Sequence, residues 1–311
     1  MSSFANHFVL AAPVFILVLV GYACARLSRS LGAASDALTR FVFALALPAL
    51  LFRMMSDLSR LPPVDSRLLL AFFGGCFIVF GIGRVLARAL FGLDGVSQSV
   101  FALGGIFSNN VLLGVPYAKS VLGQAALPSV ALVLVFNSLT LWTLATVSVE
   151  WARYGELSLR GFVATARSVL TNPVVAAILS GAAFGLSGLR LPALVDQPLS
   201  MLASAAAPMS LVALGMGLAQ YGVRAAWPQS LAICVLKLIV SPLVVLLLAW
   251  LLHLPPMETR VVVLLSALSV GVNVYLMARE FDAMQGPVAS SMVLSTAFSA
   301  LTAPLALAAA G

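Results

Sequence analysis

The sequence predicts an all-α membrane protein of ten transmembrane helices, arranged as two five-helix repeats of opposite orientation. The first observation is composition: 62% of the 311 residues are hydrophobic, 9% are charged, and the mean hydropathy is +1.10. A soluble domain needs a far more charged surface than this. The second observation is a series of long apolar runs, and the third is a set of residues that recurs at a fixed interval. Together they indicate that most of this chain lies in a lipid bilayer.

Ten apolar runs are each long enough to cross a membrane, which takes about 20 residues for roughly 30 Å of hydrocarbon. They are separated by clusters of Arg, Asp, Pro and Gly, and they cover residues 8–26, 38–56, 67–90, 97–122, 126–149, 168–189, 199–220, 228–252, 259–279 and 287–310. The first run is expected to be retained as a span, because Met1 to His7 contains no basic residue of the kind found in cleaved signal peptides. Ten spans leave no room for a separate soluble domain.

The longest polar stretch divides the chain into a first repeat (1–150), a linker (151–167) and a second repeat (168–311). Basic residues are distributed unequally between the two sides of the predicted membrane. Ten lie in connections after odd-numbered spans, namely Arg26, Arg29, Arg40, Arg84, Arg88, Arg153, Arg160, Arg167, Arg224 and Arg279. Six lie on the other side: Arg53, Arg60, Arg67, Lys119, Arg190 and Arg260. The positive-inside rule therefore predicts a cytoplasmic linker, with both termini outside the inner (cytoplasmic) membrane.

The internal repeat is visible in the spacing of prolines and glycines. Pro13, Gly21 and Pro48 recur 160 residues later as Pro173, Gly181 and Pro208, Asp36 recurs as Asp196, and Pro128 recurs after 159 residues as Pro287. Because each half holds an odd number of spans, the second half must enter the membrane from the opposite side. Such inverted repeats are typical of alternating-access carriers, which bind substrate near the midplane on broken helices; a duplication kept only for packing is the alternative.

The fourth and ninth runs are predicted to contain these breaks. Polar residues and glycines interrupt them in Gly104-Gly105-Ile106-Phe107-Ser108-Asn109-Asn110, followed by Gly114 and Pro116, and in Ser266-Ala267-Leu268-Ser269-Val270-Gly271-Val272-Asn273. Backbone groups freed at a break cannot face lipid, so they must face protein or a water-filled cavity.

The candidate substrate-binding residues lie at these two interruptions. They are Asn109, Asn110, Asn273, Ser108, Ser269 and Gly271. Amide groups in an apolar span are costly unless they find partners, and the alternative to substrate binding is a hydrogen bond between helices. Lys237 is about 15 Å inside the eighth run at 1.5 Å per residue, and an ionisable group at that depth is expected to support the breaks or the coupling of transport. A purely structural cation is the alternative.

The sequence shows no residue pattern that would support another class of function. Cys24, Cys76 and Cys234 lie in apolar runs without metal-site spacing, and His7 and His253 lie at the ends of runs. No catalytic set and no nucleotide-binding loop is recognisable. The net charge of +7 comes from basic residues scattered over short loops, which fits membrane orientation and not nucleic-acid binding. Neither a cofactor nor a metal is therefore expected, and an enzyme is not favoured.

Taken together, these motifs resemble the auxin efflux carrier family, which includes plant auxin exporters and bacterial carriers of malonate, malate and similar anions. The resemblance spans nearly the whole chain and is carried by Phe41-Val42-Phe43-Ala44-Leu45-Ala46-Leu47-Pro48, Phe52, Asn109, Gly114-Val115-Pro116, Lys119, Gly123, Asn172-Pro173, Lys237, Pro242, Gly271 and Ala278-Arg279-Glu280-Phe281. It implies a five-plus-five inverted repeat whose helices 4 and 9 break and cross at the midplane, with one bundle moving against a scaffold. The family usually places a proline at each crossover, whereas this chain has Ser108 and Ser269, whose hydroxyls are expected to satisfy loosened backbone groups.

The function predicted from the sequence is secondary transport of a small monocarboxylate or dicarboxylate by alternating access. An anion channel or a non-transporting membrane receptor on the same helices is the alternative. The partners expected are the organic anion and the lipid bilayer, with a homodimer left open and no nucleic acid. None of the ten acidic residues is clearly deep in the core, which argues against sodium coupling, while proton coupling, exchange and uniport stay open.

Overall fold

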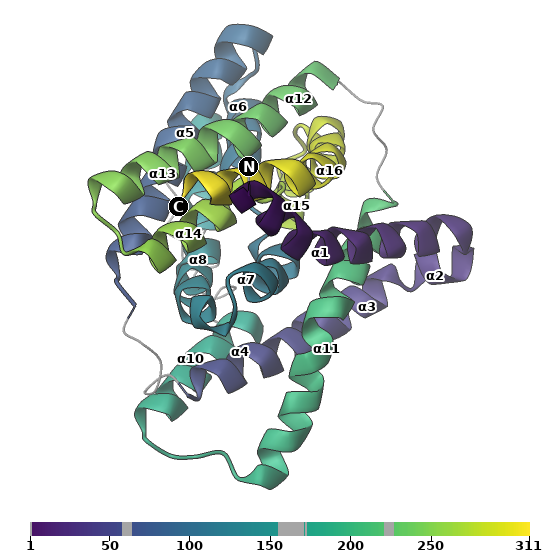
Figure 1. The fold of residues 1–311 in the computed structure, drawn as a ribbon. Helices are drawn as coiled ribbons and strands as arrows, with labels where there is room; N and C mark the ends of the chain where they lie inside the picture. Colours follow the sequence, from purple (N-terminus) through teal and green to yellow (C-terminus); the bar gives the residue numbers. More distant parts are fainter. Residues whose placement is uncertain (1, 58–63, 155–170, 172, 221–226) are drawn as a thin grey trace.

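The computed structural model describes residues 2–57, 64–154, 171, 173–220 and 227–311. All regular elements in these ranges are helices, and the single extended contact is an isolated bridge between Ser108 and Val270 (Figure 1). The predicted linker 151–167 lies outside the described residues from position 155 onward. The prediction of an all-helical chain is confirmed for the part that is described.

The helices of the first half follow the predicted runs. They are α1 (Ser2–Leu27), α2 (Arg29–Ala33), α3 (Ser35–Phe41), η1 (Val42–Ala46), α4 (Leu47–Met55), α5 (Arg67–Phe91), α6 (Gly95–Ile106), η3 (Asn110–Gly114), α7 (Val115–Val121), η4 (Gln124–Ala126) and α8 (Leu127–Tyr154). The second half holds α10 (Pro173–Leu186), α11 (Ala193–Leu218), α12 (Trp227–Val235), η5 (Leu236–Val240), α13 (Ser241–Leu251), α14 (Pro256–Ala267), α15 (Val272–Glu280) and α16 (Gln285–Ala309).

Seven helical segments among the described residues are long and apolar enough to cross a membrane, so the chain is a multi-pass membrane protein. They are Phe8–Leu27, Ser35–Met55, Arg67–Phe91, Gln124–Arg153, Ala193–Leu218, Trp227–Leu251 and Gln285–Ala309. The fourth and ninth predicted runs are missing from this set because each is broken into two shorter helices. The sixth is represented by the shorter apolar helix α10.

The second span of each half begins earlier than predicted. Asp36 and Asp196 were expected just before the second span of each half, but they lie in the first turns of α3 and α11. A carboxylate is favourable there because the N-terminus of a helix carries partial positive charge.

Three short π-helical segments, η1, η3 and η5, each precede a proline by two residues. The prolines are Pro48, Pro116 and Pro242. Proline has no N–H to donate, and its ring clashes with the carbonyl group four residues earlier. Widening the helix by one residue accommodates this clash at these three prolines.

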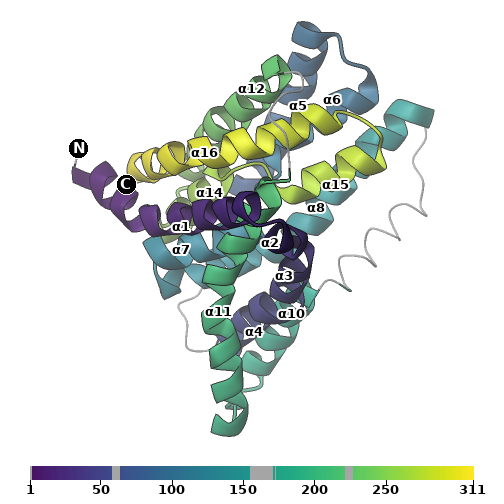
Figure 2. The same ribbon diagram turned by 90° about the vertical axis from the view of Figure 1, so that its right-hand side faces the viewer.

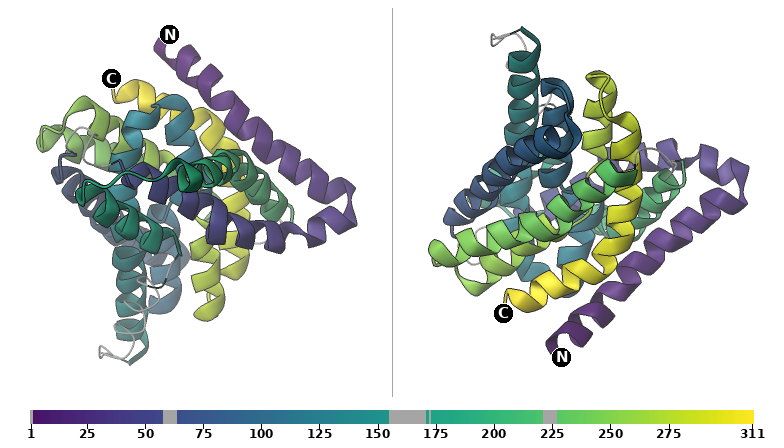
Figure 3. Two further views of the ribbon diagram at one scale, coloured as in Figure 1. Left: turned by 90° about the horizontal axis from the view of Figure 1, so that it is seen from below. Right: turned by 90° about the horizontal axis from the view of Figure 1, so that it is seen from above.

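The helices form two groups. The first helix group consists of α1–α4, α10 and α11, and the second helix group consists of α5–α8 and α12–α16 (Figures 1 and 2). Within the first group, α1 packs on α11 and α10 packs on α4. Seen from above, α1 runs along one edge of the molecule and the N-terminus lies near the C-terminus (Figure 3). The interface between the two groups is where the functional site is found.

Glycines allow the closest helix contacts in the first group. A Cβ atom on Gly21 of α1 would come within 3.0 Å of the Val212 backbone in α11, and a Cβ atom on Gly181 of α10 would come within 3.0 Å of the Phe52 backbone in α4. These distances are shorter than real Cβ contacts, so only glycine fits at both positions.

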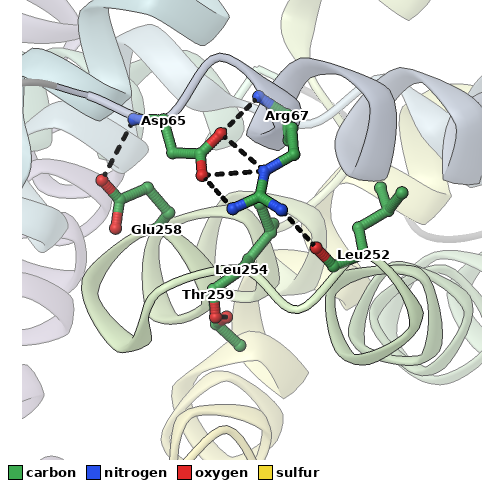
Figure 4. A network of polar contacts seen from close by, with 6 residues as sticks. All are labelled: Asp65, Arg67, Leu252, Leu254, Glu258 and Thr259. Atoms are coloured by element: carbon green, nitrogen blue, oxygen red, sulfur yellow. Dashed lines mark hydrogen bonds and ion pairs between the residues drawn. The ribbon is translucent and has the colours of Figure 1, made fainter.

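A polar network joins the start of α5 to the connection between α13 and α14 (Figure 4). The Arg67 guanidinium pairs with the Asp65 carboxylate and donates to the Leu252 carbonyl oxygen at 3.2 Å. The Asp65 backbone N–H donates to the Glu258 carboxylate at 3.4 Å. Hydrogen bonds from Arg67 hold the pKa of Asp65 below its usual value. These contacts hold helices of the second group together at one end.

Candidate functional site

The first break interrupts the fourth predicted span after α6. Phe107 leaves the helix with an extended backbone (φ −84°, ψ 98°), and helical backbone resumes at Asn110 in the π-helical segment η3. Pro116 lies just after η3, at the start of α7, and the π-helical turn accommodates its ring.

The second break interrupts the ninth predicted span between α14 and α15. Leu268 and Gly271 both have extended backbones, with ψ of 165° and 148°. Both interruptions predicted from the sequence are therefore present at the predicted residues.

The two breaks cross and pair with each other. The Asn109 N–H donates to the Ser269 carbonyl oxygen at 2.9 Å, and the Gly271 N–H donates to the Phe107 carbonyl oxygen at 2.8 Å. A Cβ atom on Gly271 would lie 2.9 Å from the Ser108 carbonyl oxygen. This antiparallel pairing supplies partners for backbone groups that neither helix can satisfy alone.

The expected role of the two serine hydroxyls is wrong. Ser108 Oγ and Ser269 Oγ are buried without a hydrogen-bond partner among the described residues, so neither satisfies a loosened backbone group there. Ser295 of α16 does this instead, because its Oγ accepts from the Val270 N–H at 3.0 Å. The extended bridge joins Ser108 to Val270 and leaves Ser269 one residue away from it.

A cavity of about 70 Å³ lies against the crossing. Its polar wall contains Ser108, Asn109, Asn110, Gly271 and Asn273 from the two breaks, together with Asn137 from α8. Its apolar wall includes Phe43 of η1 and Val174 and Val175 of α10, all from the first helix group. The cavity thus lies between the two helix groups, and it brings together five of the six predicted binding residues.

Amide groups at this cavity have unused hydrogen-bonding capacity. Asn109 is 6% exposed and Asn110 is 1% exposed. In the part of the chain that the structure describes, Asn109 Nδ2 and Asn110 Oδ1 are buried without partners, while Asn110 Nδ2 donates to Asn137 Oδ1 at 3.4 Å. An unpartnered buried amide group costs about 1–3 kcal/mol, so these atoms are suited to meeting a ligand.

Backbone donors also remain free at this cavity. Among the described residues, the N–H groups of Val111, Leu112, Val272 and Asn273 have no acceptor. All four residues line the cavity, at the first turns of the helices that follow the two breaks. Each such helix start carries about half a unit of positive charge and can bind an anion.

Lys237 is fully buried, as predicted, but it does not line the cavity. Its Nζ donates to the Ser266 carbonyl oxygen in the last turn of α14. A cation at a helix C-terminus counters the partial negative charge of the unpaired carbonyl groups. The structure therefore places the Lys237 amine behind the second break, at the C-terminus of α14.

Asn137 was not predicted from the sequence. The available signal was a single amide in the apolar run 126–149, which a hydrogen bond between helices explains equally well. Its proximity to Asn110 follows from the packing of α8 on η3. Within the described ranges, no group of three or more His, Cys, Asp or Glu side chains is placed to hold a metal ion.

Comparison with known proteins places this geometry in context. A family model described as "Membrane transport protein" matches residues 7–307. The chain is also similar to a protein of Rhizobium meliloti (strain 1021) named "Putative malonate transporter". The two are 27% identical over 297 residues, which are 94% of this chain and 92% of the other.

Proposed function

We propose that this chain, which belongs to the membrane transport protein family, is a secondary carrier that moves small organic anions across the inner membrane by alternating access. The resemblance to auxin efflux carriers that the sequence indicated is thereby confirmed at the level of the family. Short dicarboxylates are the substrate class we favour, since the similar protein is named for malonate.

One observation carries this proposal: free donors from both broken helices converge on a single cavity. Two helix starts and the unpartnered Nδ2 of Asn109 face a space that no charged side chain lines among the described residues. A carboxylate needs several donors, and these helix starts provide them together with partial positive charge. Recognition of the anion then requires no arginine.

An inverted repeat is supported by a reciprocal pair of helix contacts. Gly21 of α1 meets Val212 of α11, and Gly181 of α10 meets Phe52 of α4. Adding 160 to Gly21 and Phe52 gives Gly181 and Val212, so exchange of the two halves turns one contact into the other. The packing of α5 on α6 and of α13 on α14 follows the same exchange.

Alternating access is supported by the two walls of the cavity. The polar lining residues all belong to the second helix group, and the first group contributes Phe43, Val174 and Val175 to the lining. Movement of one group past the other would expose the crossing to opposite membrane faces without breaking its backbone hydrogen bonds. The cavity of about 70 Å³ is far smaller than the 300–1,000 Å³ of drug-sized ligand pockets, which favours a substrate of few atoms.

The proposed orientation places both termini outside, on the basis of the ten-to-six distribution of basic residues. The test is a fluorescent reporter that matures only in the cytoplasm. It is fused to the protein after Gly311, and the fusion is expressed in bacteria. It should stay dark, and the same reporter inserted in the 151–167 linker should be bright. A bright C-terminal fusion would reverse the orientation.

The test of transport itself is counterflow in proteoliposomes. Vesicles preloaded with unlabelled malonate should accelerate the entry of labelled malonate, because an alternating-access carrier exchanges substrate across the membrane. Unitary currents without counterflow would indicate an anion channel. Binding without either would indicate a receptor. A thermal-shift series with malonate, malate, lactate and indole-3-acetate would rank the substrate classes through ligand stabilisation.

A further inference from the structure

The pair formed by Asn110 and Asn137 presents both a donor and an acceptor to the cavity. One hydrogen bond joins the two side chains, from Asn110 Nδ2 to Asn137 Oδ1 at 3.4 Å. An amide side chain holds one carbonyl oxygen and one NH2 group. Whichever way the two amides are turned, that bond uses one of each, and one carbonyl oxygen and one NH2 group remain.

These remaining groups are free for a ligand. Asn110 Oδ1 is buried without a partner, and no partner of Asn137 Nδ2 exists among the described residues. Asn137 is 3% exposed and lines the cavity together with Asn110. An ionised carboxylate has only acceptors and would face the free carbonyl oxygen unfavourably. A protonated carboxyl group matches the pair, because its O–H donates and its C=O accepts.

The charge of the cavity also fits a single negative charge. Two helix starts contribute about half a positive charge each, which sums to roughly one unit. No charged side chain among the described residues lines the cavity. A dianion would therefore leave about one negative charge uncompensated in a buried site, where such a charge is costly.

From these observations we propose that the Asn110–Asn137 pair binds a protonated carboxyl group, so that a dicarboxylate is carried as its singly charged hydrogen form. This inference rests on the proposed function. The ionised carboxylate lies at the helix starts beside Asn109, and the protonated carboxyl lies against the amide pair. The proton enters and leaves on the substrate, and no residue of the chain has to accept or release it.

The ionisable side chains on the surrounding helices are not placed to exchange this proton, so the substrate itself carries it. Lys237 and Cys76 lie away from the cavity, with Lys237 bonded to Ser266. Tyr117 packs edge-to-face on Phe15 of α1, with ring centroids 5.7 Å apart. Arg84 of α5 donates to Ser148, and Lys119 of α7 and Glu258 of α14 are also outside the cavity lining.

The test compares three probes on the wild-type protein in proteoliposomes, each as a competitor of labelled malonate at a series of pH values. Malonate loses its second proton as pH rises. Malonamate carries one carboxylate and an amide that is both donor and acceptor at every pH. Monomethyl malonate carries one carboxylate and an ester that only accepts. Malonamate therefore imitates the hydrogen form permanently, and the ester lacks its donor.

We expect the apparent affinity for malonate to fall about tenfold per pH unit above its second ionisation, because the hydrogen form becomes rarer by that factor. The affinity for malonamate should stay constant and exceed that for the ester at least tenfold. Equal pH dependence of malonate and malonamate, or equal affinity of malonamate and the ester, would overturn the inference while leaving carrier function intact. Absence of uptake for malonate and every other short dicarboxylate would overturn the inference together with the proposed substrate class.

Asn137→Leu provides the matched variant, because leucine has the same branched shape as asparagine and no polar atoms. The preference of this variant for malonamate over the ester should be about tenfold smaller than that of the wild-type protein. A purely structural amide pair would lower the unfolding temperature and leave the ratio of the two affinities unchanged. The probe series on the wild-type protein stands without this variant if the variant does not fold.

Discussion

The two broken helices cross as partners, yet their polar groups are satisfied very differently. At the second break, Ser295 accepts from the Val270 N–H, and Lys237 donates to the Ser266 carbonyl oxygen. At the first break, Asn109 Nδ2 and Asn110 Oδ1 are buried without a partner among the described residues, whereas Ser269 Oγ is the one such side-chain atom of the second break. The two breaks thus have similar backbone geometry but differ in how their polar side chains are paired.

This difference indicates a division of labour. Buried polar groups are normally paired, so a cluster of unpaired ones is costly unless a ligand uses it. The first break holds most of the unpaired side-chain groups, and the second break has the Lys237 amine behind it. We therefore expect changes at the second break to affect the integrity of the crossing, and changes at the first break to affect substrate affinity.

The largest effect is expected for Lys237→Ala. It leaves the Ser266 carbonyl unpaired, at about 1–3 kcal/mol, and opens a cavity behind the crossing, at about 2–5 kcal/mol. Transport in proteoliposomes should fall at least about 100-fold by these magnitudes. Lys237→Met, which keeps the length without the charge, should fail similarly, whereas Lys237→Arg should retain more activity. Equal losses in the arginine and alanine variants at normal expression would exclude a role for the charge.

The next largest effect tests whether the two breaks contribute differently to substrate affinity. Asn109→Ala removes a hydrogen bond to a charged group, worth about 1.5–3 kcal/mol, so calorimetry should show substrate affinity reduced ten- to hundredfold. Folding should change little because Asn109 Nδ2 has no protein partner to lose. The matched variant is Asn273→Ala at the second break, for which a smaller loss is expected. Equal losses would show that both breaks share the substrate, and wild-type affinity in Asn109→Ala would move the carboxylate site to Asn273.

The positions of the breaks could be predicted from the sequence because polar residues and glycines are conspicuous inside apolar runs. Ser108, Asn109 and Gly271 therefore reached the crossing as expected. The partners could not be predicted, because Ser295 and Asn137 come from helices far along the chain and only tertiary packing brings them close. For the same reason, the sequence could not show whether a serine hydroxyl at a break or one on α16 accepts from the freed backbone N–H of Val270.

Lys237, behind the second break, shows the same limit of prediction from sequence. Its depth in an apolar run predicted burial, since position along a helix fixes depth in the membrane. Its separation from the cavity could not be derived, because the sequence does not specify which face of η5 meets α14. Likewise, the irregular turns before Pro48, Pro116 and Pro242 have a local cause, but their exact geometry depends on neighbouring helices.

A smaller effect is expected from closing the space between the two breaks. Gly271→Ala would place a Cβ atom 2.9 Å from the Ser108 carbonyl oxygen, so the crossing must shift at a cost of about 1–3 kcal/mol. The unfolding temperature in detergent should fall, and exchange should slow. Gly81→Ala is the control because a Cβ atom there meets nothing within 4 Å. It should behave like wild type, and equal behaviour of Gly271→Ala would show that the breaks are not packed as tightly as we describe.

The smallest effect concerns how the two broken spans begin. Asp94 caps α6, since its Oδ1 accepts from the N–H groups of Val96 and Ser97 at 2.9 and 3.0 Å. Pro255 precedes α14 without any side-chain cap. Asp94→Ala should therefore lower the unfolding free energy by about 0.5–2 kcal/mol, whereas Asp94→Asn keeps an accepting oxygen and should cost less. Pro255→Ala should be nearly neutral at the cap position of the second broken span.

Hydrogen bonding by the Ser97 backbone N–H is the main cause that lowers the pKa of Asp94 in the folded protein. A lowered folded pKa means that the charged cap stabilises the protein above the unfolded pKa of about 3.9, and that this contribution disappears as pH falls through the folded value. Thermal unfolding should thus show a gap between wild type and Asp94→Asn near neutral pH that closes only in acid below about pH 4. A gap that stays constant down to about pH 3 would mean that the carboxylate charge adds nothing to the cap, and that the first broken span begins no more firmly than the second.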